Sequence, residues 1–323
     1  MVMENWREKL CAVRDANNAA AWTIAEYIDE TPTAITASLI HDADPDGELP
    51  EETLYAAFMA GFAGVPEDDR IIPDYLTEAV HRLDIADYID NPYLKTIRFP
   101  DAATRHWRFT HYTYKPYEAF ICNDIHMEPD LREIPQAGYF RERFSYPAVE
   151  QDGREWMAVK PSEIETMRGA IGIVKGKVVT FGLGLGYFAF MASSKQDVES
   201  VDIVERDEEV IDLFSRHILP QFPERDKIRI IRSDAFDFMH HEMECYGYDH
   251  AFVDLWHDTA DGLELYLKAK GIETMFSYWA EESLLSAYRW TIFDEIIAEC
   301  GTEAEAIEKL SDKALKIRLQ GLA

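Results

Sequence analysis

The sequence predicts an α/β fold: a doubly wound parallel sheet preceded by an N-terminal helical domain and a β-rich connecting segment. Residues 177–207 read as strand, glycine turn, helix, strand and acidic residue. Strands and helices then keep alternating beyond Glu205. Before about residue 95, apolar residues recur every three or four positions, as one face of a helix requires. We therefore expect a helical domain over 1–95, a β-rich segment over 96–160 and a sheet domain with a helical tail over 161–323.

The glycine turn has the features of a ligand-binding βαβ unit. It reads Gly182-Leu183-Gly184-Leu185-Gly186 and follows a β-branched run. Glycines let the backbone turn tightly and approach a ligand without a Cβ in the way. Glu205 comes about 20 residues later, where an acidic side chain at the end of the second strand holds a ribose diol. The order predicts a Rossmann-like nucleotide fold.

The chain beyond Glu205 repeats this pattern. Asp207 is the expected N-cap of a helix that Pro220 stops. A strand over 227–233 ends at Asp234-Ala235, and another over 250–253 ends at Asp254. The carboxyl ends of parallel strands share one edge of the sheet, so these acids are expected at one ligand site. Two tail helices are expected over 283–299 and 303–319. A sixth and a seventh strand of the sheet are therefore expected to be absent or replaced by helices.

The first 160 residues divide into a part with helical periodicity and a part rich in aromatic and β-branched residues. Helices are predicted over 6–28, 34–40, 51–62 and 73–83, and β-structure over 96–99, 107–112, 117–121, 139–146 and 155–159. Asn91-Pro92-Tyr93 is interpreted as a turn.

Composition limits the classes of partner. The net charge of −29 opposes nucleic-acid binding, which depends on Lys and Arg. It suits a neutral or cationic small molecule, but a solvated acidic surface explains it more simply. No apolar run reaches 18 residues, so no membrane span is expected, and the start lacks signal-peptide features. The four cysteines are scattered, which indicates a cytoplasmic protein. Self-association into a homo-oligomer is left open.

No metal site is predicted. Asp42 to Leu49 resembles the first half of a calcium-binding loop, but the twelfth position is Thr53 where a bidentate Glu is required. The groups Cys122 to Glu128 and His240 to Cys245 have no recognised metal spacing. We interpret all three as loops or helix ends.

The glycine spacing separates two cofactors. A dinucleotide turn usually reads GxGxxG, and the third glycine position is Tyr187. GxGxG with acids at three successive strand ends resembles class I S-adenosylmethionine (SAM)-dependent methyltransferases. The resemblance implies that Gly182, Gly184 and Gly186 face the methionine and ribose, Glu205 binds the ribose hydroxyls, and Asp234 and Ala235 bind adenine. Asp254 would lie by the methionine amine or the acceptor.

The run from Val204 to Trp256 also resembles the spermidine-synthase branch of that superfamily, which carries a β-rich segment ahead of its sheet. Two departures from that branch oppose aminopropyl transfer. Position 183 is Leu where a GGGxG turn is favoured, and the loop after the fourth strand reads Asp254-Leu255-Trp256-His257-Asp258.

The expected reaction is in-line methyl transfer from SAM to a nitrogen or oxygen of a small neutral or cationic acceptor. Asp254 is the candidate catalytic residue and His257 a second candidate base. Trp256 is expected to wall the site, and Glu163 either approaches the methionine end or lies on the surface. The alternatives are an aminopropyltransferase that uses decarboxylated SAM and a non-catalytic SAM-binding protein.

Overall fold

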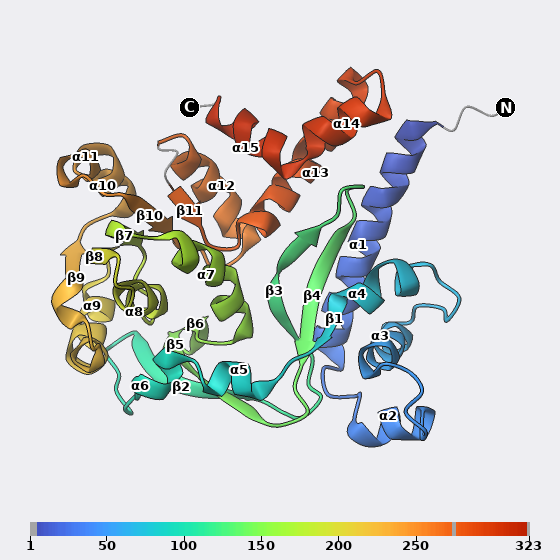
Figure 1. Ribbon diagram of the computed structural model, residues 1–323, viewed down its shortest axis with the longest axis horizontal. Helices are drawn as coiled ribbons and strands as arrows, with labels where there is room; N and C mark the ends of the chain where they lie inside the picture. Colours follow the sequence, from blue (N-terminus) through green and yellow to red (C-terminus); the bar gives the residue numbers. More distant parts are fainter. Residues whose placement is uncertain (1–4, 273–275, 322–323) are drawn as a thin grey trace. The chain divides into compact units, whose positions relative to one another are not determined.

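A computed structural model describes residues 5–272 and 276–321, which form two compact units (Figure 1). The first unit comprises the residues up to Ile85, Thr113–Phe144 and Leu285–Ile317. The second comprises Ala86–Tyr112, Ser145–Leu284 and the residues from Arg318. The boundaries expected at 95 and 160 divide the chain differently, because both units are assembled from segments that are far apart in the sequence.

The second unit contains a five-stranded sheet in which every pairing is parallel, in the order β11-β10-β7-β8-β9. Helices α8 and α9 lie on one side of this sheet and α10 and α12 on the other (Figure 1). The predicted Rossmann-like, doubly wound α/β fold is therefore confirmed. Its elements are α7 (Pro161–Ile173), β7 (Gly176–Phe181), α8 (Tyr187–Ser193), β8 (Val198–Glu205), α9 (Glu208–His217), η2 (Leu219–Gln221), η3 (Arg225–Lys227), β9 (Ile228–Arg232), α10 (Ala235–His241), α11 (Met243–Tyr246), β10 (His250–Val253), α12 (Thr259–Lys270) and β11 (Phe276–Tyr278).

Local chemistry places these elements as predicted. Val178, Val179 and Phe181 of β7 are fully buried, as a strand covered on both faces requires. The carboxylates of Asp207 and Asp234 accept the first N–H groups of α9 and α10, so both residues are N-caps. The fifth strand, β11, was not predicted. Among the residues that the structure describes, no strand follows it.

A smaller sheet, in the order β2-β5-β6, belongs mostly to the second unit. Its strands are β2 (Trp107–Tyr114), β5 (Phe144–Gln151) and β6 (Arg154–Ala158). Asp152 and Gly153 join β5 to β6 with φ of 50° and 81°, the conformation of a two-residue hairpin turn. Short helices α5 (Ile85–Ile89) and α6 (Pro92–Thr96) precede this sheet.

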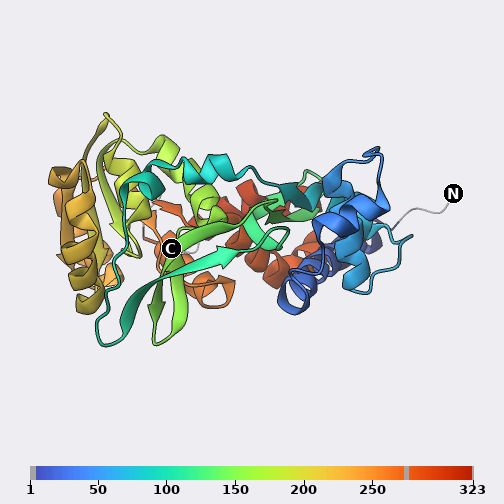
Figure 2. The same ribbon diagram turned by 90° about the horizontal axis from the view of Figure 1, so that it is seen from below.

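The first unit begins with three helices, α1 (Trp6–Glu30), α2 (Ala37–Ala43) and α3 (Glu51–Phe62), drawn in blue in Figure 2. The fourth predicted helix, over 73–83, is confirmed only up to Ala79 and is wrong beyond it. Residues 72–76 form a π-helical turn, residues 77–79 a single α-turn, and Val80–Arg82 form strand β1. Strand β1 pairs in parallel with β4 (Glu133–Tyr139), which pairs with β3 (Phe120–Met127), and this pairing overrides the local helical pattern.

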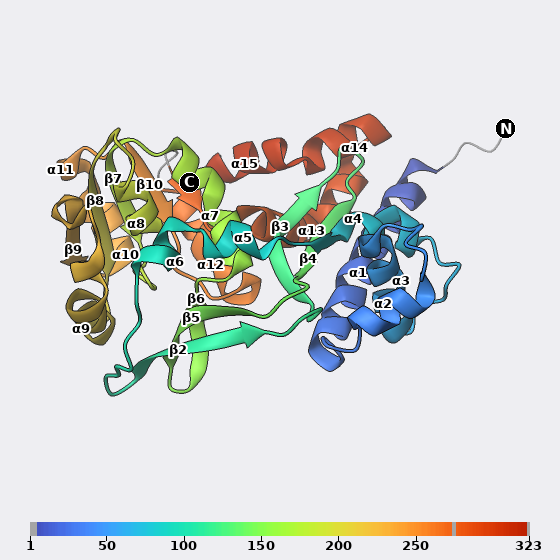
Figure 3. The same cartoon turned by 60° about the horizontal axis from the view of Figure 1, so that its bottom comes forward.

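The C-terminal helices complete the first unit beside the β3–β4 hairpin (Figure 3). They are α13 (Glu281–Glu299), α14 (Glu303–Leu310) and α15 (Asp312–Gln320), so the single helix expected over 303–319 is two. The Arg289 guanidinium is fully buried and donates to Glu133 of β4, to Asp312 and to the Leu310 carbonyl. Within residues 5–272 and 276–321, no helix is long and apolar enough to cross a membrane.

Candidate active site

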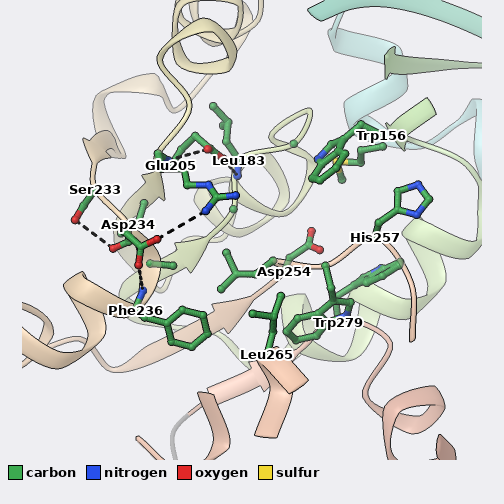
Figure 4. A pocket seen from close by; sticks show the side chains of 18 of the residues that line it. Trp156, Leu183, Glu205, Ser233, Asp234, Phe236, Asp254, His257, Leu265 and Trp279 are labelled. Carbon is green, nitrogen blue, oxygen red and sulfur yellow. Dashed lines mark hydrogen bonds and ion pairs between the residues drawn. The ribbon is translucent and has the colours of Figure 1, made fainter. Parts of the chain in front are cut away.

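A cavity of about 410 Å³ lies in the second unit at the carboxyl ends of β7, β8, β9 and β10. This is the edge at which doubly wound sheets bind ligands, and the volume falls in the range of small-molecule sites. Figure 4 shows its side chains. The residues that line it are Trp156, Met157, Glu163, Gly182, Leu183, Gly184, Val204, Glu205, Arg206, Ser233, Asp234, Ala235, Phe236, Asp254, Leu255, Trp256, His257, Leu265, Lys268 and Trp279.

The glycine turn forms the floor of the cavity, and two of its glycines are required by close contacts. Gly182 has φ of 98°, and a Cβ there would lie 2.0 Å from the carbonyl oxygen of Asp254. Gly184 has φ of 49°, and a Cβ there would lie 2.0 Å from the Met157 sulfur. Gly186 does not line this cavity, and it is the N-cap of α8. Of the three predicted glycines, Gly182 and Gly184 line the cavity.

The N–H groups of the turn are mostly used inside the protein. Gly182 donates to the Val204 carbonyl, Leu183 to the Glu205 carboxylate at 3.2 Å, Leu185 to the Met157 sulfur at 3.2 Å and Gly186 to the Leu183 carbonyl. A dinucleotide diphosphate needs free N–H groups at this turn. With four of the five N–H groups of residues 182–186 already donating, the turn does not offer such a cradle.

Residues from outside the central sheet brace the turn from its other side. The Tyr93 hydroxyl donates to the Leu185 carbonyl at 2.5 Å. The Asn91 side chain donates to the Tyr187 hydroxyl at 3.0 Å and also accepts from the Tyr93 N–H. Asn91-Pro92-Tyr93, predicted to be a turn, is thus the beginning of α6 and a support for the glycine turn. The phenol of Tyr187, which occupies the position of a third glycine, forms part of this support.

Glu205 and Asp234 lie at the ends of successive strands, as predicted. Glu205 accepts N–H groups from Leu183, Arg206 and Asp207, which fixes its carboxylate at the cavity wall. Asp234 uses one oxygen to cap α10, and its other oxygen lies 3.9 Å from the Arg206 guanidinium. A carboxylate oxygen can accept more than one hydrogen bond. The Glu205 and Asp234 carboxylates therefore keep the capacity to accept hydrogen bonds from ligand hydroxyl or amino groups.

Arg206, Asp234, Phe236 and Lys268 form one end of the cavity, which we call the charged end. The Lys268 ammonium lies 3.8 Å from the centre of the Phe236 ring. Ala235 is buried beside them as the first residue of α10. The flat Phe236 ring and the Asp234 carboxylate suit a planar heterocycle that carries an amino group.

Trp156, Glu163, His257 and Trp279 form the opposite end, which we call the aromatic end. The Trp156 and His257 rings lie 5.9 Å apart, and His257 Nε2 lies 3.2 Å from the Glu155 carbonyl. His257 is half exposed, on the loop after β10. The indole N–H of the buried Trp256, which also lines the cavity, has no hydrogen-bond partner among the described residues.

Asp254 lies between the two ends (Figure 4). The surrounding protein, followed by the nearby Glu205 charge, raises the pKa of Asp254 to about 7. Glu163 comes from the first turn of α7 and is only 8% exposed. Burial, followed by the Asp254 charge, raises the pKa of Glu163 to about 8, against the lowering effect of the nearby Lys160 charge. Perturbed carboxyl pairs of this kind are typical of functional sites.

Several of the lining residues could not be predicted from the sequence. Trp156 and Met157 come from β6, Lys268 from α12, and Trp279 follows β11. Trp156 is a large aromatic residue that is 43% exposed, which distinguishes it from an ordinary core position. Within the described ranges, no three His, Cys, Asp or Glu side chains gather in a geometry that would hold a metal ion.

Comparisons with known proteins add little to this geometry. No family model matches the sequence, and no curated protein sequence matches it. One similar solved structure is from Streptococcus mutans and is assigned as a SAM-dependent methyltransferase, with 17% identity and a TM-score of 0.30. The matched region covers 42% of this chain and 36% of that protein.

Proposed function

We propose that the second unit binds SAM and transfers its methyl group to a small-molecule acceptor. The observation that carries the proposal is the set of three carboxylates at successive strand ends, Glu205, Asp234 and Asp254, around one cavity with a glycine floor. SAM has hydroxyl, amino, ammonium and sulfonium groups and no phosphate, so it matches an acidic cavity whose turn already uses four of its five N–H groups.

The residues present fit this cofactor in a defined order. Glu205 is positioned to accept the ribose hydroxyls, and Asp234 to accept the adenine amino group beside Phe236. Asp254 is positioned near the methionine ammonium and the acceptor. When bound, SAM supplies an electrophilic methyl group. The protein contributes alignment of the two reactants, which supplies about 7–11 kcal/mol, and exclusion of water by Trp156 and Trp279.

Asp254 is the residue to which we assign proton removal from the acceptor, with His257 as a second candidate base. With its pKa at about 7, Asp254 is partly ionised at neutral pH, where a general base works best. His257 is half exposed at the cavity rim and is the weaker candidate.

A binding experiment tests the proposal. SAM and S-adenosylhomocysteine should raise the thermal stability of the protein, and 100 Kd of ligand contributes about 2.7 kcal/mol. Glu205→Ala should weaken both ligands at least tenfold by calorimetry. Glu199→Ala changes an exposed residue of the same strand and should bind them normally. If neither adenosyl ligand binds, or if NAD binds in their place, the proposal is wrong.

A second candidate, aminopropyl transfer from decarboxylated SAM, has one observation in its favour. The aromatic end, among the described residues, contains two carboxyl neighbours and no lysine or arginine to pair with a methionine carboxylate. Decarboxylated SAM lacks that carboxylate. A preference for decarboxylated SAM over SAM of more than tenfold in the same calorimetric assay would favour this candidate. Binding of SAM with no transfer to any acceptor would favour a SAM-binding sensor.

A further inference from the structure

The aromatic end of the cavity has chemical features that binding of the adenosyl group does not use. Trp156 and Trp279 present indole rings, and the Glu163 carboxyl faces Asp254. The ribose and adenine partners, Glu205 and Asp234, belong to the other side of Asp254 (Figure 4). The aromatic end is therefore the place available for the acceptor, and its chemistry indicates which acceptor fits.

The charged groups at the aromatic end favour binding of a cationic acceptor. Among the described residues, the two Lys or Arg side chains that line the cavity are Arg206 and Lys268, and both lie at the charged end. Lys160 is near Glu163 but forms an ion pair with Glu155 at 2.5 Å. An anionic acceptor would find no unpaired cation here. An alkylammonium ion would find indole faces and carboxyl oxygens, both of which attract it.

We propose that the acceptor is a small aliphatic amine that binds as its ammonium ion, and that Glu163 and Asp254 act together as a carboxyl pair that shares one proton and takes one from the amine. This inference rests on the proposed methyl transfer. An N–H bond of the ammonium breaks and its proton moves to Asp254. The freed nitrogen lone pair forms the N–CH₃ bond, and the S–CH₃ bond breaks with its electron pair passing to sulfur. The methylated ammonium leaves, and the pair returns one proton to water.

The surroundings of the pair raise the pKa of Asp254 to about 7 and that of Glu163 to about 8, so a single negative charge prevails between these two values. Asp254 faces the Glu205 charge, and Glu163 faces the charges of Asp254, Lys160 and Glu155. Two interacting carboxyls that line one cavity do not ionise together, so the second proton stays until higher pH. One negative charge balances one ammonium ion and still leaves a base for its proton.

Ligand binding tests the acceptor class without turnover. The protein saturated with S-adenosylhomocysteine is titrated by calorimetry at pH 7.5 with n-butylamine, an ammonium ion at this pH, and with 1-butanol. We expect n-butylammonium to bind at least tenfold more tightly than 1-butanol, and Asp254→Asn to remove most of this difference. Asp237→Asn, at an exposed position that does not line the cavity, should retain it.

The outcomes separate this inference from the proposed function. If S-adenosylhomocysteine itself fails to bind, the proposed function is wrong. If it binds but 1-butanol binds as tightly as n-butylammonium, or if Asp254→Asn leaves the preference intact, the amine inference is overturned and SAM binding stands.

The pH profile tests the role of Glu163. Wild-type methylation of n-butylamine should rise near pH 7, as Asp254 ionises, and fall above about pH 8, as the second ionisation holds the ammonium in its charged form. Glu163→Gln should keep the rise and lose the fall, because Gln mimics the protonated carboxyl and cannot ionise. Glu165→Gln, two residues along α7 and outside the cavity lining, should keep both limbs. A Glu163→Gln profile that keeps the fall would refute the shared proton.

Discussion

Glu163→Gln should stabilise the protein, and the gain should grow with pH. Burial raises the pKa of Glu163 in the folded protein to about 8 from an ordinary value of 4.5. The folded state therefore binds this proton more tightly than the unfolded state. The stability that the neutral carboxyl contributes is fully present below about pH 4.5 and is lost as pH rises through 8. Gln resembles the neutral carboxyl at every pH, so the Glu163→Gln variant does not lose this stability as pH rises.

The magnitude follows from the width of the shift. Each pKa unit corresponds to about 1.4 kcal/mol. Ionisation of Glu163 between pH 5 and pH 9 therefore lowers the free energy of unfolding of the wild-type protein by at most about 4 kcal/mol. Urea unfolding at those two pH values, followed by tryptophan fluorescence, measures the difference between Glu163→Gln and wild type. We expect it to be under about 1 kcal/mol at pH 5 and about 2–4 kcal/mol at pH 9.

Glu165→Gln provides the comparison, since it makes the same chemical change on the same helix away from the cavity. Its stability relative to wild type should not change with pH in this way. An equal difference between Glu163→Gln and wild type at pH 5 and pH 9 would refute the claim that Glu163 is held neutral. So would a loss of stability at pH 9.

Three further predictions concern other contacts. Gly184→Ala should weaken SAM binding at least tenfold by calorimetry, because its Cβ would lie 2.0 Å from the Met157 sulfur, whereas Gly61→Ala, with nothing within 4 Å, should bind normally. Tyr93→Phe should lower the free energy of unfolding by about 1–3 kcal/mol, because the buried Leu185 carbonyl loses its donor, and an unchanged urea midpoint would contradict this. Arg289→Met should cost about 3–5 kcal/mol by leaving Glu133 buried without its cation, and calorimetric unfolding at the wild-type temperature would contradict it.

The parts of the fold that depend on neighbouring residues could be predicted from the sequence. The alternating strands and helices from Gly176 to Val253 and the N-cap Asp207 depend on local chemistry, and both are confirmed. Strand β1 could not be predicted, because Val80–Arg82 becomes a strand only by pairing with residues 137–139.

The candidate site divides in the same way. Glu205, Asp234 and Asp254 could be placed because the carboxyl ends of parallel strands meet at one edge. Other elements contribute further lining residues to the same cavity, namely Trp156, Met157, Lys268 and Trp279. No spacing in the sequence predicts that these residues line it. The environment of Glu163 is also a tertiary property, since a glutamate in the first turn of a helix is more often exposed. The catalytic roles of Asp254 and His257 stay predictions.

The buried contact between Arg289 and Glu133 has a consequence for how the chain folds as it is made. The two residues are 156 positions apart, and between them the ribosome must synthesise nearly the whole second unit. Domains generally fold as they emerge from the ribosome. The first unit can complete its fold only after its last segment, Leu285–Ile317, has been synthesised. We therefore expect nascent chains that stop before residue 285 to hold a folded sheet domain while the residues up to Ile85 remain open to proteases, although they left the ribosome first.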